Sequence, residues 1–101
     1  MSDSDAYDDE DGWPVVPTTR ARAVLNHAAL HDVDAFSAYI AVTAAISEAH
    51  EMGIQPPGAR VDNEAAGTWT IDLPRGHGIA RYTYTGRPPT ILDDVVMPDL
   101  E

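Results

Sequence analysis

The stretch "TWTIDLPRGHGIARYTYT" (Thr68–Thr85) alternates apolar and polar residues twice, with a glycine-rich turn between the two halves. The apolar members are Trp69, Ile71 and Leu73 in the first half and Ala80, Tyr82 and Tyr84 in the second. A period of two residues is typical of strands that bury one face. The stretch therefore predicts a β-hairpin that packs one face on a core and exposes the other.

The next segment predicts a third strand. A turn over residues 86–89, "GRPP", leads into "TILDDVVM" (Thr90–Met97), which is apolar at both ends. A bulge in that strand would let both Asp93 and Asp94 reach water. Short turns between consecutive strands favour an antiparallel meander, and residues 60–67 before it are interpreted as a loop.

Two helices are expected before the sheet. Thr18 or Thr19 is a suitable N-cap for a helix that runs to about His31. Its apolar stripe is Ala21, Val24, Leu25 and Ala28. Asp34 is the expected N-cap of a second helix through about Met52, with Gly53 in the left-handed conformation behind it and Ile54 as the hydrophobic follower. The expected apolar surface comprises Phe36, Tyr39, Ile40, Val42, Thr43, Ile46 and Ala49. One long helix broken near Asp32 is the alternative.

The fold class follows from this order. We expect an α+β, two-layer domain over residues 13–97, in which a helical hairpin packs on a three-stranded antiparallel meander. The segment "WPVVP" (residues 13–17) is either a short N-terminal edge strand or an extended lead-in that docks Trp13 on the core. Residues 1–12 form an acidic tail that is expected to be disordered, and residues 98–101 form an acidic C-terminal end.

Composition excludes several classes of protein. The 101 residues carry a net charge of -11, with six arginines, no lysine and no cysteine, so disulfides and thiolate metal sites are absent. Six of the 17 acids lie in residues 1–12, which leaves 17 - 6 = 11 acids against six arginines in the remainder. Such a charge disfavours generic binding to DNA or to a membrane. Without a secretory signal or a membrane-spanning stretch, we expect a soluble, cytoplasmic protein.

Four cationic side chains on or beside the middle strand are the candidate catalytic residues: Arg75, His77, Arg81 and Arg87. Arginine clamps phosphate, histidine transfers protons near neutral pH, and an RNA endonuclease that uses the 2′-hydroxyl needs no metal. The alternation, however, places Tyr82 and Tyr84 on the face opposite Arg81, where they would be core residues.

The remaining candidate sites are weaker. His27 and His31 lie four residues apart on the first expected helix and could share a metal, but two ligands leave zinc half-coordinated. We therefore predict no metal and no cofactor. The acidic pairs Asp93/Asp94 and Glu48/Glu51 are interpreted as solvated faces.

The layout resembles the RelE/ParE toxin superfamily: a short first strand, a helical hairpin and a three-stranded meander. The segments that carry the resemblance are "GTWTIDL" (residues 67–73), "ARYTY" (residues 80–84) and "TILDDVV" (residues 90–96). An arginine followed by an aromatic residue in the middle strand of that family maps onto Arg81 and Tyr82. The chain departs from the family in lacking lysine and a basic or aromatic residue near its C-terminus, which fits a catalytically silent or gyrase-type member better.

The expected function is that of a small non-enzymatic regulator or inhibitor that binds a protein partner, for instance a cognate regulator or a nucleic-acid-binding protein. The alternative is a RelE/ParE-like toxin that acts on RNA, or on a replication or translation target. Candidate binding residues are Arg81, Arg87, Trp13 and the acids of the tail, Asp8, Asp9, Glu10 and Asp11, which could imitate nucleic-acid charge. The sequence leaves open whether the chain forms a homodimer.

Overall fold

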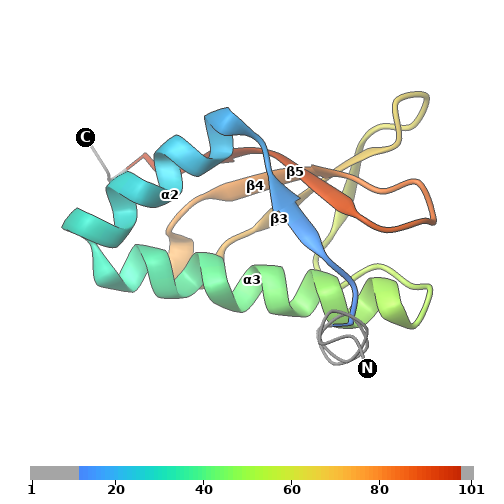
Figure 1. Cartoon of the computed structure of the whole chain (residues 1–101), viewed down its shortest axis with the longest axis horizontal. Coiled ribbons are helices and arrows are strands. Elements are labelled where there is room, and N and C mark those ends of the chain that lie inside the picture. Colours follow the sequence, from blue (N-terminus) through green and yellow to red (C-terminus); the bar gives the residue numbers. More distant parts are fainter. Residues whose placement is uncertain (1–11, 99–101) are drawn as a thin grey trace, which may run out of the picture.

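A computed structural model describes residues 12–98 as two helices packed on one face of a five-stranded sheet (Figure 1). The elements in chain order are β1 (Val15–Pro17), α2 (Thr19–His31), α3 (Val33–Glu51), β2 (Arg60–Asn63), β3 (Thr68–Asp72), the 3₁₀ turn η1 (Pro74–Gly76), β4 (Ile79–Thr83) and β5 (Thr90–Val96). The α+β class is thus confirmed. Neither described helix is both long and apolar enough to cross a bilayer.

The sheet is larger than the sequence predicts, and it is mixed. Its strand order is β1-β5-β4-β3-β2, and β1 runs parallel to β5. The expected loop over residues 60–67 is wrong, because β2 pairs antiparallel with β3 there. All four residues of β2 are exposed, so this strand lacks the apolar alternation that reveals a half-buried strand. The pairing of β1 with β5 joins segments 75 positions apart, such as Val15 and Thr90, which no local pattern can show.

A single residue, Asp32, separates the helices. Of the two predicted caps, Thr18 and Thr19, the structure selects Thr18, whose hydroxyl accepts from the Ala21 N–H at 3.2 Å. The N-cap of α3 is Asp32 and not Asp34: the Asp32 carboxylate accepts from the Ala35 N–H at 3.1 Å. The backbone N–H of Asp32 also bonds to the Ala28 carbonyl, so the residue ends one helix and begins the next.

The buried stripe of α3 differs from the prediction by about one position. It comprises Ala35, Ala38, Val42, Ile46, Ala49 and His50, whereas Ile40 is 49% exposed. Alanines at these positions let the helix approach the sheet closely, and the larger Phe36 and Tyr39 pack at the margin of the core. Gly53 has a φ of +78° and closes the helix as expected, but Ile54 is 55% exposed.

The predicted bulge in β5 is confirmed. Arg81 pairs with Asp94 and the next residue, Tyr82, pairs with Leu92, which leaves Asp93 as the extra residue of the bulge. Both aspartates are half-buried on the side of the sheet away from the helices. On the helix side of the same strands Tyr82, Leu92 and Val95 are buried in the core.

Candidate functional site

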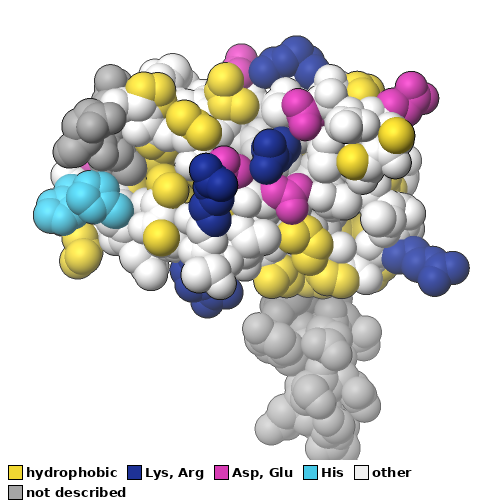
Figure 2. All heavy atoms as spheres, turned by 90° about the horizontal axis from the view of Figure 1, so that it is seen from above, with side chains coloured by type: hydrophobic (Ala, Val, Ile, Leu, Met, Phe, Trp, Pro, Cys, Tyr) yellow, Lys and Arg dark blue, Asp and Glu magenta, His cyan; other side chains and the backbone are white. Residues whose placement is uncertain are grey.

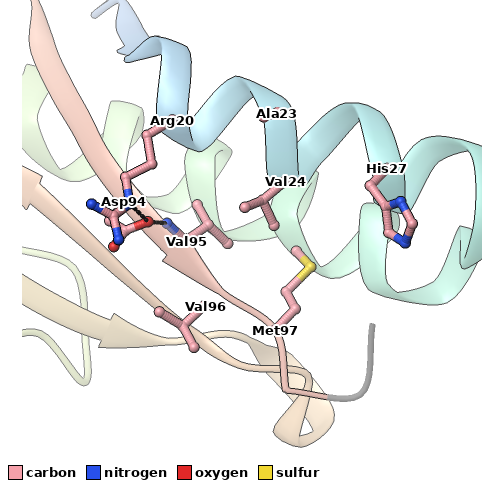
Figure 3. A pocket seen from close by; sticks show the side chains of 8 residues that line it. All are labelled: Arg20, Ala23, Val24, His27, Asp94, Val95, Val96 and Met97. Carbon is pink, nitrogen blue, oxygen red and sulfur yellow. Dashed lines mark hydrogen bonds and ion pairs between the residues drawn. The ribbon is translucent and has the colours of Figure 1, made fainter. Parts of the chain in front are cut away.

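A groove lies where the sheet is incomplete. β1 pairs only with Thr90–Leu92, whereas β5 continues to Val96. Within residues 12–98, the outer edge of β5 beyond Leu92 therefore has no strand beside it. Helix α2 runs along this free edge and leaves a groove of about 530 Å³ between helix and strand (Figure 3).

The groove has an apolar floor between polar ends. Its lining residues are Arg20, Ala23, Val24 and His27 from α2 and Asp94, Val95, Val96 and Met97 from the end of β5. Figure 3 shows Val24 and Met97 pointing toward each other across the groove, with His27 at the end away from Arg20. The α2 residues recur at intervals of three and four, so they share one face of the helix.

Asp94 closes one end of the groove. Its Oδ1 accepts a hydrogen bond from the Val95 N–H at 2.9 Å and lies 3.5 Å from Nε of Arg20. Arg20 is mostly exposed, so this ion pair contributes at most about 1 kcal/mol. The main effect of the ion pair is to hold the Asp94 carboxylate over the Val95 N–H, which is the first backbone N–H on the edge of β5 beyond Leu92.

A second constellation, around His50, lies on the helix-covered side. His50 is 1% exposed; its Nδ1 lies 2.7 Å from Oγ1 of Thr90, and its Nε2 lies 3.0 Å from Oε1 of Gln55. The Tyr82 hydroxyl donates to the same Gln55 oxygen at 2.6 Å, and the Trp13 indole N–H donates to Thr90 Oγ1 at 2.7 Å.

These contacts define one protonation state for His50. The Gln55 carbonyl oxygen can only accept, so His50 Nε2 carries the proton and Nδ1 accepts from the Thr90 hydroxyl. A second proton on the ring would leave the Thr90 hydroxyl hydrogen without an acceptor among these groups. Burial accordingly lowers the pKa of His50 below its ordinary value, against the opposing effect of its hydrogen bond to Gln55. Burial also raises the pKa of Tyr82.

The His50 network is closed to reactants. No buried side-chain nitrogen or oxygen of the described residues lacks a hydrogen-bond partner. Trp13, a candidate binding residue, is half-buried here: its ring lies edge-on to His50, and its carbonyl accepts from Ser47 Oγ at 2.6 Å. Tyr84 stacks on the His50 ring with 3.9 Å between centroids. The network holds the start of the described chain against α3 and β5.

The four candidate catalytic residues are not brought together. Arg81 is exposed near the middle of β4, on the uncovered face of the sheet. Arg75 and His77 lie in the turn before β4, where Arg75 has a φ of 59°, and Arg87 lies in the turn after it. Because β4 separates the two turns, these side chains form no single cluster.

The remaining predicted site residues that the structure describes lie on the two helices. The rings of His27 and His31 lie with their centroids 4.4 Å apart on the exposed side of α2, as their spacing predicts. Across residues 12–98 there is no group of three or more side chains placed to hold a metal ion. Glu48 and Glu51 lie on α3 and are both exposed, as the interpretation of a solvated face predicts. The tail acids Asp8, Asp9, Glu10 and Asp11 lie outside the described residues.

Comparison of the chain with protein-family models, with curated proteins and with solved structures finds no match. Sequence reasoning missed the groove and the roles of His50, Gln55 and Thr90. A signal existed for one wall only: Arg20, Ala23 and His27 share a helical face with Val24, which belongs to the predicted stripe.

Proposed function

We propose that the protein is a non-enzymatic regulator that binds an extended segment of a protein partner in the groove between α2 and β5. The observation that carries this proposal is the free edge of β5 beyond Leu92, which lies beside an apolar groove. An extended segment there would continue the position of β1 in the sheet and gain backbone hydrogen bonds beyond the Asp93 carbonyl and the Val95 N–H, which are already bonded to Thr18 and Asp94. Val24 and Met97 would receive one of its apolar side chains.

The distribution of titratable groups supports binding over catalysis. Burial raises the pKa values of Tyr39 and Tyr82 and lowers that of His50. Tyr82 and His50 are sealed in the core, and Tyr39 is half-buried at its margin. The groove contains one arginine–aspartate pair and one histidine, without a nucleophile or an arranged acid and base. Its residues are suited to shape and charge recognition.

Site-specific photo-crosslinking tests the proposal. A photoreactive amino acid at Ala23, which is exposed and lines the groove, should form an adduct with a partner protein in host cells. Peptide mapping should place the crosslink in an extended segment of that partner. The same amino acid at Ala29, exposed on α2 but outside the groove lining, is the matched control and should form no such adduct.

The crosslinking results distinguish binding in the groove from binding elsewhere. Equal adducts from both positions, or none from Ala23, would contradict binding in the groove. Loss of the Ala23 adduct after Val96→Glu, with helical circular dichroism unchanged, would strengthen it, because Val96 lines the opposite wall.

A RelE/ParE-like action on RNA is the second candidate, and the exposure of Arg81 on the uncovered face favours it. Arg81 makes no ion pair with any residue in the range 12–98 and is accessible to a phosphate. This candidate predicts growth arrest and mRNA cleavage on expression, abolished by Arg81→Ala in a folded protein. Normal growth with intact mRNA would exclude it.

A further inference from the structure

The face of the sheet that the helices leave uncovered carries an ordered pattern. Two cross-strand pairs flank its centre along β4 and β5: Ile79 with Val96 at one end and Thr83 with Ile91 at the other. Ile79 and Val96 are 44% and 54% exposed. Figure 2, a view from above the orientation of Figure 1, shows Lys/Arg and Asp/Glu side chains gathered near the middle of the visible surface with hydrophobic ones around them.

The centre of this face is locally neutral in a strongly acidic protein. Arg20 and Arg81 lie near Asp93 and Asp94, two positive charges against two negative ones, whereas the whole chain carries -11. Asp94 is paired with Arg20, and Asp93 accepts from the Thr83 hydroxyl at 2.6 Å. Arg81 alone of the four makes neither an ion pair nor a side-chain hydrogen bond with any residue in the described part of the chain.

We propose that the uncovered faces of two copies pack against each other in a two-fold homodimer, with Arg81 of each copy bound to the carboxylates of the β5 bulge in the other. The register between β4 and β5 supports this arrangement. A two-fold axis parallel to these strands and between them exchanges their positions, so each residue lies over its own cross-strand neighbour in the second copy. Ile79 then meets Val96, and Arg81 meets Asp94, with Asp93 beside it as the extra residue of the bulge.

A second copy fits this face better than a partner of single charge. A basic or an acidic partner would find attractive and repulsive charges together at the centre, whereas an identical face places opposite charges over each other there and Ile79 over Val96. The neutral centre is also a place where two chains of charge -11 can meet without local repulsion. Arg20, Asp94 and Val96 border both the groove and this face, but the dimer contacts do not require a segment bound in the groove.

Two opposite charge changes test the dimer. Arg81→Asp places a carboxylate opposite Asp93 of the second copy, and Asp93→Arg places a guanidinium opposite Arg81, so each variant alone should be monomeric. In a mixture of the two variants, each side chain at the Arg81 position again faces an opposite charge at the Asp93 position, and a heterodimer should form. Sedimentation velocity over a concentration series measures this directly. Wild type should dimerise, more strongly as salt screens the net charge of each chain.

Controls make the outcomes decisive. Arg87→Asp adds the same charge change in an exposed turn and should dimerise like wild type. Circular dichroism establishes that each variant is folded. The proposal is overturned if wild type stays monomeric at every concentration, if Arg81→Asp dimerises like wild type, or if the mixture of folded variants does not associate.

Discussion

The two faces of the sheet use polar side chains in opposite ways. On the helix-covered face the polar atoms of His50, Thr90 and Gln55 bond one another in a network without an open position. On the uncovered face Arg81 is exposed and has no described ion-pair partner. Buried polar groups must be satisfied within the chain, whereas exposed ones can bond to water or to another molecule. The first face therefore stabilises the fold, and the second is available for recognition.

The two faces should differ most in the loss of stability when one of their polar side chains is replaced by alanine. His50→Ala removes a fully buried ring and leaves Thr90 and Gln55 each short of a partner, so we expect a loss of about 3 kcal/mol in the free energy of unfolding. Urea denaturation followed by circular dichroism measures it. Arg81→Ala, on the other face, should change stability by less than about 0.5 kcal/mol. Comparable losses for both variants would abolish the distinction.

An isosteric pair of substitutions sharpens the comparison. Thr90→Val deletes a hydroxyl that accepts from Trp13 and donates to His50, and it should cost about 2 kcal/mol. Thr70→Val removes the same atoms from the uncovered face of β3, where Thr70 makes no side-chain hydrogen bond with described residues, and it should stay within about 0.5 kcal/mol of wild type. Thermal unfolding of both variants beside wild type gives the comparison. Equal effects would show that the hydroxyl of Thr90 contributes nothing specific.

Acidification should gradually lower the free energy of unfolding through His50 on the helix-covered face. Because the pKa of His50 is lowered in the folded protein, the unfolded chain binds the proton more readily. The contribution of neutral His50 to the free energy of unfolding is thus fully present above pH 6.5, the ordinary pKa of histidine. It decreases as the pH falls from there toward the lower pKa of the folded state. Urea midpoints between about pH 7.5 and about pH 5.5 measure this slope. His50→Gln removes the titrating ring and should flatten it; an unchanged slope would assign the effect to other groups.

Expectations from the sequence were most accurate where the pattern is local. Thr18 as a helix cap, the alternation around Tyr82 and the bulge at Asp93 and Asp94 depend on neighbours in the chain, and the structure contains all three. The cap of α3 was misplaced by two residues because Asp32 and Asp34 are equally good cap residues, and packing selects between them. Strand β2 was missed because its side chains are all exposed.

The candidate sites also divide into features that local spacing predicts and features that require tertiary contacts. Spacing alone placed Arg81 on the face opposite Tyr82 and brought His27 near His31. The groove, in contrast, requires β5 to extend past β1 and α2 to lie beside the remaining edge. The His50 network joins residues up to 77 positions apart.

The sequence by itself determined most elements of this protein, the cap of its first helix and the two-sided character of its strands, because periodicity and capping act over a few residues. Only the tertiary structure decided the parallel pairing of β1 with β5, the groove that this short strand leaves open and the burial of His50. Those features form when segments far apart in the sequence bury apolar surface against each other. The free energy gained depends on the area buried and not on sequence separation, so no local pattern reveals which segments will pack together.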